Sequence, residues 1–286
     1  MPSKVYFTRN ITPENVLKLY EACGLELSGN VAVKLHSGEK GNQNFLSPEF
    51  WRPMIEHVHG TVVECNTAYP GSRNTTAAHW QTMRDHGWSD AFTVDIMDEE
   101  GPDLQLLIPN GKVIQKNYVG KHLTRYDSML VLSHFKGHPM GGFGGALKQL
   151  SIGCASSAGK ANIHGAGKPE EMWTTEQNAF LESMADAAES VVKLFDGKIV
   201  YINVMKNMSV DCDCCAVAED PCMKDIGILA SLDPIAIDQA CLDLVYASDD
   251  PGRDHLVERI ESLNGIYTVE AVSYTHLRAH ETCADL

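Results

Sequence analysis

The chain has 286 residues, of which 44% are hydrophobic, enough to form the core of one large α/β domain. Its 38 acidic residues outnumber its 23 basic ones, and the net charge of -15 disfavours nucleic acids and anionic membrane surfaces as partners. No apolar run approaches the ~20 residues of a membrane span, and the N-terminus lacks the apolar core of a signal peptide. We therefore expect a cytoplasmic protein.

Short strands alternate with helices through the first half of the chain. The predicted elements of this half are strands over 4–8, 31–35 and 61–64, and helices over 13–22, 48–58 and 75–86. Asn110-Gly111, between two extended runs, then predicts a hairpin over 104–118 at an antiparallel edge.

The second half continues the alternation. Its predicted elements are strands over 128–133, 199–204 and 225–230, and helices over 174–195 and 234–246. This order predicts an α/β fold with a mixed, mostly parallel sheet, helices on both faces and an antiparallel hairpin.

Polar side chains follow three of the predicted strands. Lys34 and His36 come at the end of the second strand, Arg73 lies in the loop after the third, and a segment rich in glycine and histidine follows the strand over 128–133. Because ligands of an open α/β sheet lie beyond the carboxyl ends of its strands, we expect these loops to meet in one crevice. Lys34, His36 and Arg73 are therefore candidate cofactor-binding residues.

A glycine-rich stretch, GGFGG, ends with Gly144 and Gly145 and looks at first like a phosphate loop. Lys148 comes three residues after Gly145, however, and Leu147 stands where a dinucleotide fingerprint requires glycine or alanine. Glycine still permits close backbone approach, so Gly144 and Gly145 stay candidate binding residues. An anion at the start of a short helix from Ala146 and a tight packing turn are the two interpretations.

The same segment carries His134, His138 and His164 together with Lys148. Imidazole titrates near neutral pH and binds borderline metals, and a lysine becomes a nucleophile or covalent anchor when its pKa is lowered. We predict catalytic roles for His134, His138 and Lys148. The alternative is that the histidines are ordinary buried or surface residues.

Four cysteines lie close together, namely Cys212, Cys214, Cys215 and Cys222. Thiolates bind zinc or iron–sulfur clusters, and this set could reach one ion if the loop folds back. The spacing matches neither the paired cysteines of zinc ribbons nor the repeated pairs of ferredoxins. Metal ligands and a redox-sensitive or inert cysteine loop are the alternatives.

Several segments together resemble the DUF362 family: VAVKLHSGE (31–39), ECNTAYPGSRNTTAAH (64–79), LSHFKGHPMGGFGGALKQLSIGCAS (132–156), VDCDC (210–214) and DIGILASLDPIAIDQACLDLV (225–245). Many members of this largely uncharacterised family are described as iron–sulfur proteins. The resemblance thus implies an iron–sulfur cluster or another transition metal, with redox or metal-cofactor chemistry on a small molecule or a redox partner. The chain lacks the ferredoxin cysteine pattern, which leaves VDCDC as the candidate ligand set.

A second resemblance concerns HPMGGFGGALK and the NIH that follows it. These are similar to the H-x-x-x-G-[FY]-x-G-G-x-K and NH motifs of lactate racemase and its nickel-pincer relatives, although Leu147 stands where arginine is usual. The resemblance implies that Lys148 anchors a nickel-pincer nucleotide, His164 ligates nickel and His138 transfers a proton. An isomerase or epimerase is therefore the alternative function. A non-catalytic metal-binding module that uses only the cysteines is the third.

The end of the sequence, VSYTHLRAHETCADL, resembles translated sequencing-adapter sequence. We therefore expect one domain over residues 1–271 and a foreign, unpacked tail over residues 272–286.

Overall fold

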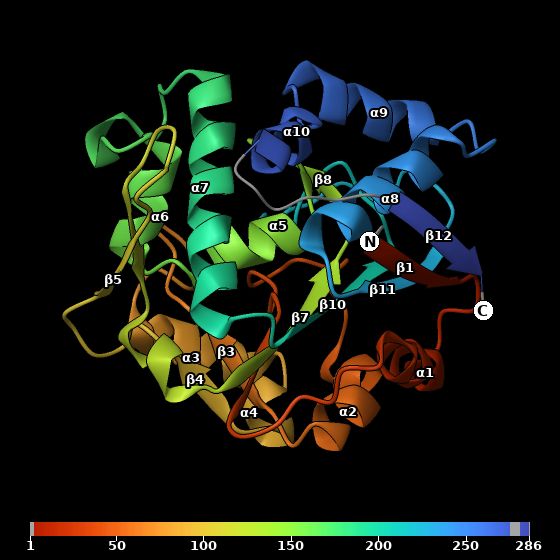
Figure 1. Cartoon of the computed structure of the whole chain (residues 1–286), viewed down its shortest axis with the longest axis horizontal. Coiled ribbons are helices and arrows are strands. Elements are labelled where there is room, and N and C mark those ends of the chain that lie inside the picture. The colour runs from red at the N-terminus through yellow and green to blue at the C-terminus, as the bar shows by residue number, and fades with distance from the viewer. Residues whose placement is uncertain (1–2, 275–280, 286) are drawn as a thin grey trace.

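The computed structural model describes residues 3–274 and 281–285. Its centre is an eight-stranded sheet with the order β12-β1-β11-β10-β7-β2-β3-β4 (Figure 1). The strands are β1 (Ser3–Thr8), β2 (Val31–Lys34), β3 (Thr61–Glu64), β4 (Val94–Ile96), β7 (Ser128–His134), β10 (Ile199–Met205), β11 (Gly227–Ser231) and β12 (Glu281–Asp285). Parallel pairing joins β10, β7, β2, β3 and β4, whereas β11 pairs antiparallel with β10 and β1. The predicted mixed, mostly parallel sheet is confirmed.

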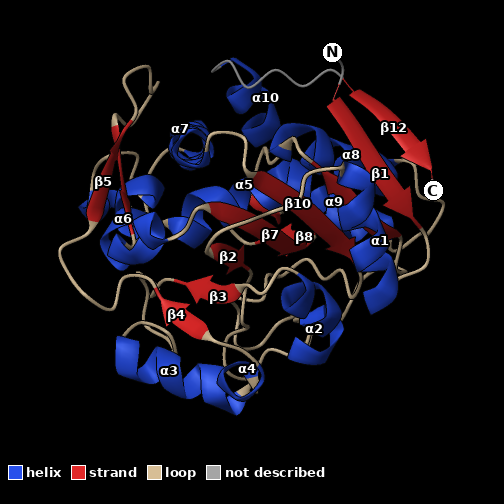
Figure 2. Cartoon of the chain, turned by 60° about the horizontal axis from the view of Figure 1, so that its bottom comes forward, coloured by secondary structure: helices blue, strands red, loops and turns tan. Residues whose placement is uncertain are grey.

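Helices cover both faces of this sheet, as predicted (Figure 2). They are α1 (Pro13–Cys23), α2 (Pro48–His57), α3 (Thr76–Asp85), α4 (Trp88–Ala91), α5 (Ala146–Lys148), α6 (Ser157–His164), α7 (Gln177–Phe195), α8 (Pro234–Tyr246), α9 (Arg253–Ser262) and α10 (Tyr267–Tyr274). Successive residues of β7 pack into different cores: Met129 and Val131 lie in the one that α7 and α8 cover, Leu130 and Leu132 in the one that α1 and α2 cover. Burial on both faces explains why this strand is apolar throughout.

The predicted hairpin is present, but its place in the fold differs from the prediction. β5 (Leu104–Leu107) and β6 (Lys116–Val119) pair antiparallel and form a separate two-stranded sheet rather than an edge of the large one. The Asp186 side chain of α7 accepts hydrogen bonds from the backbone of Lys112, Val113 and Ile114 at 2.8 to 3.0 Å. This carboxylate holds the hairpin against α7 and so keeps it away from the sheet edge.

The strand order reverses beside β2. The chain moves outward from β2 to β3 and β4, returns to place β7 on the other side of β2, and continues to β10. Two loops therefore leave the sheet in opposite directions at the ends of β2 and β7, where open α/β sheets form their binding crevice. A small sheet of β8 (Lys136–His138) and β9 (Gly142–Gly144) follows β7 directly at this point.

The end of the chain lies along the first strand. Ala271 and Val272 of α10 are buried, and β12 pairs parallel with β1 at the sheet edge. Residues 275–280 and 286 of the predicted tail lie outside the described residues, and the foreign origin of the tail stays a prediction. Across the described part of the chain, no helix has the length and apolarity that crossing a bilayer requires.

Candidate functional site

A cavity of about 300 Å³ opens where β2, β3 and β7 end. This volume lies at the lower end of the range for small-molecule sites, roughly 300 to 1,000 Å³. Its lining contains most of the residues that the sequence singles out, namely Lys34, His36, Arg73, His134, His138, Gly144, Gly145, Lys148, His164, Cys214 and Cys215. The three loops expected to meet in one crevice do meet there.

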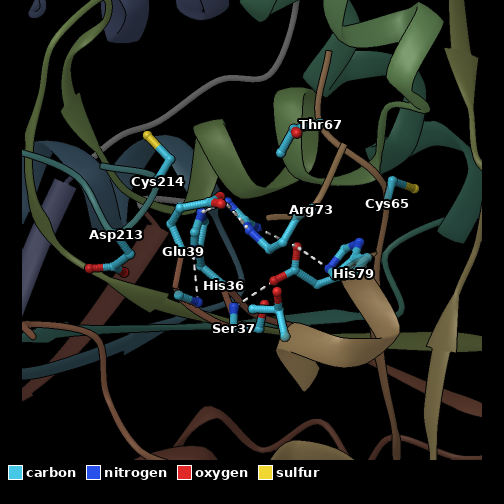
Figure 3. Close-up of polar contacts among 12 residues, drawn as sticks. His36, Ser37, Glu39, Cys65, Thr67, Arg73, His79, Asp213 and Cys214 are labelled. Atoms are coloured by element: carbon cyan, nitrogen blue, oxygen red, sulfur yellow. Dashed lines mark hydrogen bonds and ion pairs between the residues drawn. The ribbon is translucent and has the colours of Figure 1, made fainter. Parts of the chain in front are cut away.

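Arg73 lies at one wall, where its guanidinium is fully engaged by the protein (Figure 3). Nε donates to Glu39 Oε2 at 3.0 Å, and one terminal nitrogen donates to Glu64 Oε2 at 3.2 Å. The other terminal nitrogen lies 3.2 Å from His36 Nε2. With the residue only 2% exposed, these contacts make Arg73 a fixed structural charge that joins two loops.

Glu64 is the last residue of β3 and contacts Arg73. Burial opposes its charge, but Lys34, Arg73 and His79 together lower the pKa of Glu64 to about 2. The carboxylate also accepts a short hydrogen bond from the backbone N–H of Ser37. Glu64 therefore stays ionised at neutral pH and ties the end of β3 to the loop after β2.

Asp213 anchors the cysteine loop to the end of β7. Its carboxylate accepts from His134 Nδ1 at 2.9 Å and from Lys136 Nζ at 2.7 Å, and these two cations hold the pKa of Asp213 below its ordinary value in spite of burial. His134 Nε2 lies 2.6 Å from the carbonyl oxygen of Lys206. Since both partners accept, both ring nitrogens of His134 are engaged as donors. His134 thus supports the loop, with neither nitrogen left for chemistry in the cavity.

The tautomer of His138 is set by the backbone. Its Nδ1 accepts from the N–H groups of Met140 and Gly141, at 3.1 and 2.9 Å. Burial and the charge of Lys148 lower the pKa of His138 to about 4, so the ring is neutral near pH 7. The proton is therefore on Nε2, which lies 3.8 Å from Cys214 Sγ. The sequence identified His138 but could not show which nitrogen carries the proton.

The sulfurs of Cys212 and Cys214 lie beside this ring, and one ligand atom from each of the three residues falls within 4.8 Å of the others. The backbone N–H of Cys214 donates to Cys212 Sγ at 3.2 Å, which folds the loop so that both sulfurs face the same space. Burial raises the pKa of Cys212 to about 12. A buried thiol of this kind becomes a thiolate when a metal cation binds it.

The other two cysteines do not join this group. Cys215 lines the cavity, but its sulfur is outside the set of mutually close atoms. Cys222 Sγ donates to the carbonyl oxygen of Met208 at 3.3 Å. Among the residues that the structure describes, the loop thus does not fold into the four-cysteine arrangement of an iron–sulfur cluster.

His164 is the last residue of α6 and lines the same cavity. Its Nδ1 donates to the carbonyl oxygen of Lys160 at 2.7 Å, and its ring stacks on Phe180 at a centroid distance of 4.8 Å. Burial, together with Lys148 and Lys160, lowers the pKa of His164 to about 4. The unprotonated nitrogen is therefore Nε2. His164 does not belong to the group that Cys212 and Cys214 form with His138.

The backbone at Gly145 does not bind an external anion. Asp238 of α8 accepts from the N–H groups of Ala146 and Leu147, at 2.7 and 2.9 Å, and a Cβ at position 145 would lie 2.3 Å from Asp238 Oδ1. The protein's own carboxylate thus occupies the position considered for a bound anion. Gly144 lies between Lys136 and Lys148, and a Cβ there would make ordinary contacts with both.

Sequence reasoning missed several residues of the site. Asp238 and Lys160 were not identified, although Asp238 directly follows an apolar run in α8 and Lys160 is the one lysine of the small-residue helix α6, patterns that indicate a buried partner. Trp173, which lines the outer part of the cavity, follows a short 3-10 helix that has no apolar periodicity. No sequence signal marks it.

Comparison with known proteins places the chain in a family. The model of a domain of unknown function, DUF362, matches residues 31–243. The chain belongs to the DUF362 family. No curated protein matches it.

Two solved structures resemble this DUF362 protein. The lactate racemase apoprotein from Thermoanaerobacterium thermosaccharolyticum is 15% identical, with 70% of this chain and 50% of that chain covered and a TM-score of 0.46. A structural genomics target from Thermotoga maritima is 11% identical, with 92% and 58% covered and a TM-score of 0.45. The chain thus spans between half and three fifths of the length of these two proteins.

Proposed function

We propose that this DUF362 protein is a metal-dependent enzyme that holds a transition metal ion at Cys212 and Cys214 and acts on a small molecule in the adjoining cavity. The observation that carries the proposal is the mutual approach of these two sulfurs and the His138 ring within 4.8 Å, next to that cavity. Two cysteine sulfurs are donors that suit zinc, nickel or iron. Such an ion would supply Lewis acidity or a redox centre.

His138 has a separate task in this proposal. Because Nδ1 accepts two backbone N–H groups, the proton on Nε2 points to the sulfur of Cys214. An N–H group beside a thiolate stabilises its charge and tunes a metal bound to it. The same N–H group would donate a hydrogen bond to a molecule in the cavity, which is the catalytic role that we propose for His138.

The described residues also support a reduced environment. Cys212 and Cys214 are free thiols. We therefore propose a cytoplasmic protein, since thiols persist there and a thiolate metal site stays intact.

Anaerobic purification followed by elemental analysis tests the metal site. We expect about one metal ion per chain, as for a mononuclear site. Cys212→Ser and Cys214→Ser should each lose most of the metal, because a hydroxyl is a poor ligand for a thiophilic ion. Cys222→Ser is the matched control from the same loop and should retain it.

Two results would contradict the proposal. One is a chain that neither copurifies with zinc, nickel or iron nor takes up any of them on reconstitution. The other is equal metal loss in Cys222→Ser, which would point to general damage to the loop. Iron together with acid-labile sulfide would instead favour an iron–sulfur cluster.

A second candidate function is an isomerase with a nickel cofactor tethered to Lys148. Its support is the presence of Lys148, His138 and His164 in one cavity, with His164 Nε2 unprotonated. Lys148 would hold the cofactor covalently, and the unprotonated Nε2 of His164 would be free to ligate nickel. Mass spectrometry of the intact chain decides: an adduct that Lys148→Ala abolishes supports this function, and an unmodified chain that holds nickel contradicts the tether.

A further inference from the structure

The polarity of the cavity changes from its interior to its mouth. Its lining includes the side chains of one arginine and four lysines, namely Lys34, Arg73, Lys136, Lys148 and Lys160, and all of them are buried except Lys148, which is half-buried. This gathering of positive charge occurs in a chain whose net charge is -15. A positive interior in a negative protein attracts an anion to one place and disfavours anions elsewhere on the surface.

Three of these cations lack an ion-pair partner. Arg73 pairs with Glu39 and Glu64, and Lys136 pairs with Asp213. Within the described residues, no such pair forms at the three remaining lysines. Lys34 Nζ donates to Gln149 Oε1 at 2.9 Å, and Lys160 Nζ donates to the carbonyl oxygen of Ala155 at 2.6 Å. The ammonium group of Lys148 has no hydrogen-bond partner in this part of the chain. Neutral acceptors compensate the charge of a buried ammonium group only in part.

Burial also lowers the pKa of Lys34, although Glu64 opposes this effect. The pKa falls because the ammonium form loses hydration that no neighbour fully replaces. A bound anion would offset that loss.

The more exposed part of the cavity lining includes apolar side chains. Met140, Met172 and Trp173 line it there, and the Trp173 side chain is one of the few large hydrophobic groups exposed in the described chain, at 63%. Methionine and tryptophan side chains pack readily against flat apolar groups. Charged side chains are usually exposed and apolar ones buried, and this cavity has the opposite arrangement. Such an arrangement matches a ligand that is charged at one end only.

We infer that the cavity binds an amphipathic anion, with a charged end such as a phosphate monoester at Lys148, Lys160 and Lys34, and an apolar, preferably aromatic, part against Trp173. Three ammonium groups suit a phosphate monoester, which carries about -1.5 to -2 charges, better than a single carboxylate. The inference rests on the proposed function only in placing the reacting molecule in this cavity. It does not depend on which metal is bound.

Calorimetric titration of the purified chain with four probes tests both halves of the ligand. The probes are phenyl phosphate, inorganic phosphate, benzoate and benzyl alcohol. We expect phenyl phosphate to bind at least about fivefold more tightly than inorganic phosphate, as an aromatic contact supplies. Benzoate should bind more weakly than phenyl phosphate, and benzyl alcohol should not bind. Benzoate stronger than phenyl phosphate would overturn the phosphate assignment of the charged end.

Variants separate the two ends of the site. Lys148→Ala should weaken phenyl phosphate and inorganic phosphate alike, by at least about tenfold, because it removes a charge-assisted contact. Trp173→Ala should weaken phenyl phosphate about fivefold and leave inorganic phosphate unchanged. Lys168→Ala, an exposed lysine in the same stretch of chain, and Leu107→Ala, an exposed leucine of the hairpin, are the matched controls and should bind as the parent does.

The inference is overturned if phenyl phosphate does not bind, or if Lys148→Ala binds it as the parent does. An aromatic part is excluded if Trp173→Ala has no effect. Elemental analysis of the same samples measures metal content independently of probe binding, so the two proposals can fail separately. Metal loss in Cys214→Ser with phenyl phosphate still bound supports the anion site alone, and a metal-loaded chain that binds none of the probes overturns it alone.

Discussion

Asp213 and His134 form a 2.9 Å hydrogen bond that fastens the cysteine loop to the end of β7. Asp213 stands between Cys212 and Cys214 in the sequence, so its hydrogen bonds hold the stretch of backbone that carries both sulfurs. Lys136 completes the arrangement with a second bond to the same carboxylate. The position of the candidate metal ligands therefore depends on a buried ion pair that touches neither sulfur.

The first prediction concerns this ion pair. Asp213→Asn leaves the charges of His134 and Lys136 buried without a counter-charge, and breaking such a pair costs about 3 to 5 kcal/mol of unfolding free energy. We expect this loss in urea denaturation, together with loss of bound metal. Asp211 lies two residues before Asp213 and forms a partly exposed pair with Arg259. Asp211→Asn removes that pair and should change the unfolding free energy by less than about 1 kcal/mol. Equal effects of both variants would show that Asp213 has no special anchoring role.

The second prediction concerns the glycines. Gly145→Ala places a Cβ 2.3 Å from Asp238 Oδ1, so the carboxylate must leave the N–H groups of Ala146 and Leu147. We expect a loss of about 2 to 4 kcal/mol in unfolding free energy, from the displaced buried hydrogen bonds and the clash. Gly144→Ala is the control, because its Cβ meets only ordinary contacts. A Gly145→Ala chain as stable as Gly144→Ala would contradict this account of the loop.

Local sequence signals predicted the elements of the fold well. The helix over 234–246 has the predicted bounds, and the Thr12 side chain caps the first predicted helix by accepting from the backbone N–H of Asn15. These features depend on neighbours in sequence, which capping and periodicity rules describe. The predicted place of the hairpin was wrong because the hairpin is held by Asp186, which is more than 70 residues away in the sequence.

The candidate site was only partly predictable, for the same physical reason. The strand ends identified the residues that surround the cavity, since a parallel sheet gathers them at one edge. The roles of those residues depend on distant partners instead. His134 forms hydrogen bonds with Asp213 and Lys206, and the backbone of the glycine loop donates to Asp238. A histidine in a motif looks the same whether its nitrogens are free or engaged.

The third prediction separates the two lysines on either side of Gly144. Lys148 is half-buried and has no ion pair within the described residues, so Lys148→Ala should change the unfolding free energy by no more than about 0.5 kcal/mol. Lys136→Ala should cost about 3 kcal/mol, because it removes a partner of buried Asp213. Urea denaturation of both variants checks the contrast. Severe unfolding of Lys148→Ala would indicate a packing role rather than a binding role.

The last prediction concerns the pH dependence of stability at Glu64. The pKa of Glu64 is about 2 in the folded chain and has an ordinary value of 4.5. A lowered pKa stabilises the fold above pH 4.5, and this contribution is lost as the pH falls from 4.5 towards 2. At about 1.4 kcal/mol for each pKa unit, the contribution amounts to roughly 3 kcal/mol at neutral pH.

Glu64→Gln isolates this contribution. The variant should be less stable than the parent by roughly 3 kcal/mol at pH 7, and the difference should shrink as the pH falls below 4.5, because the parent then loses the charge too. Urea denaturation at several pH values between 7 and 3 measures it. Glu56→Gln, at an exposed pair with Arg52, should show a small difference throughout. A difference for Glu64→Gln that stays constant down to pH 3 would mean that Glu64 acts through hydrogen bonding rather than through its charge.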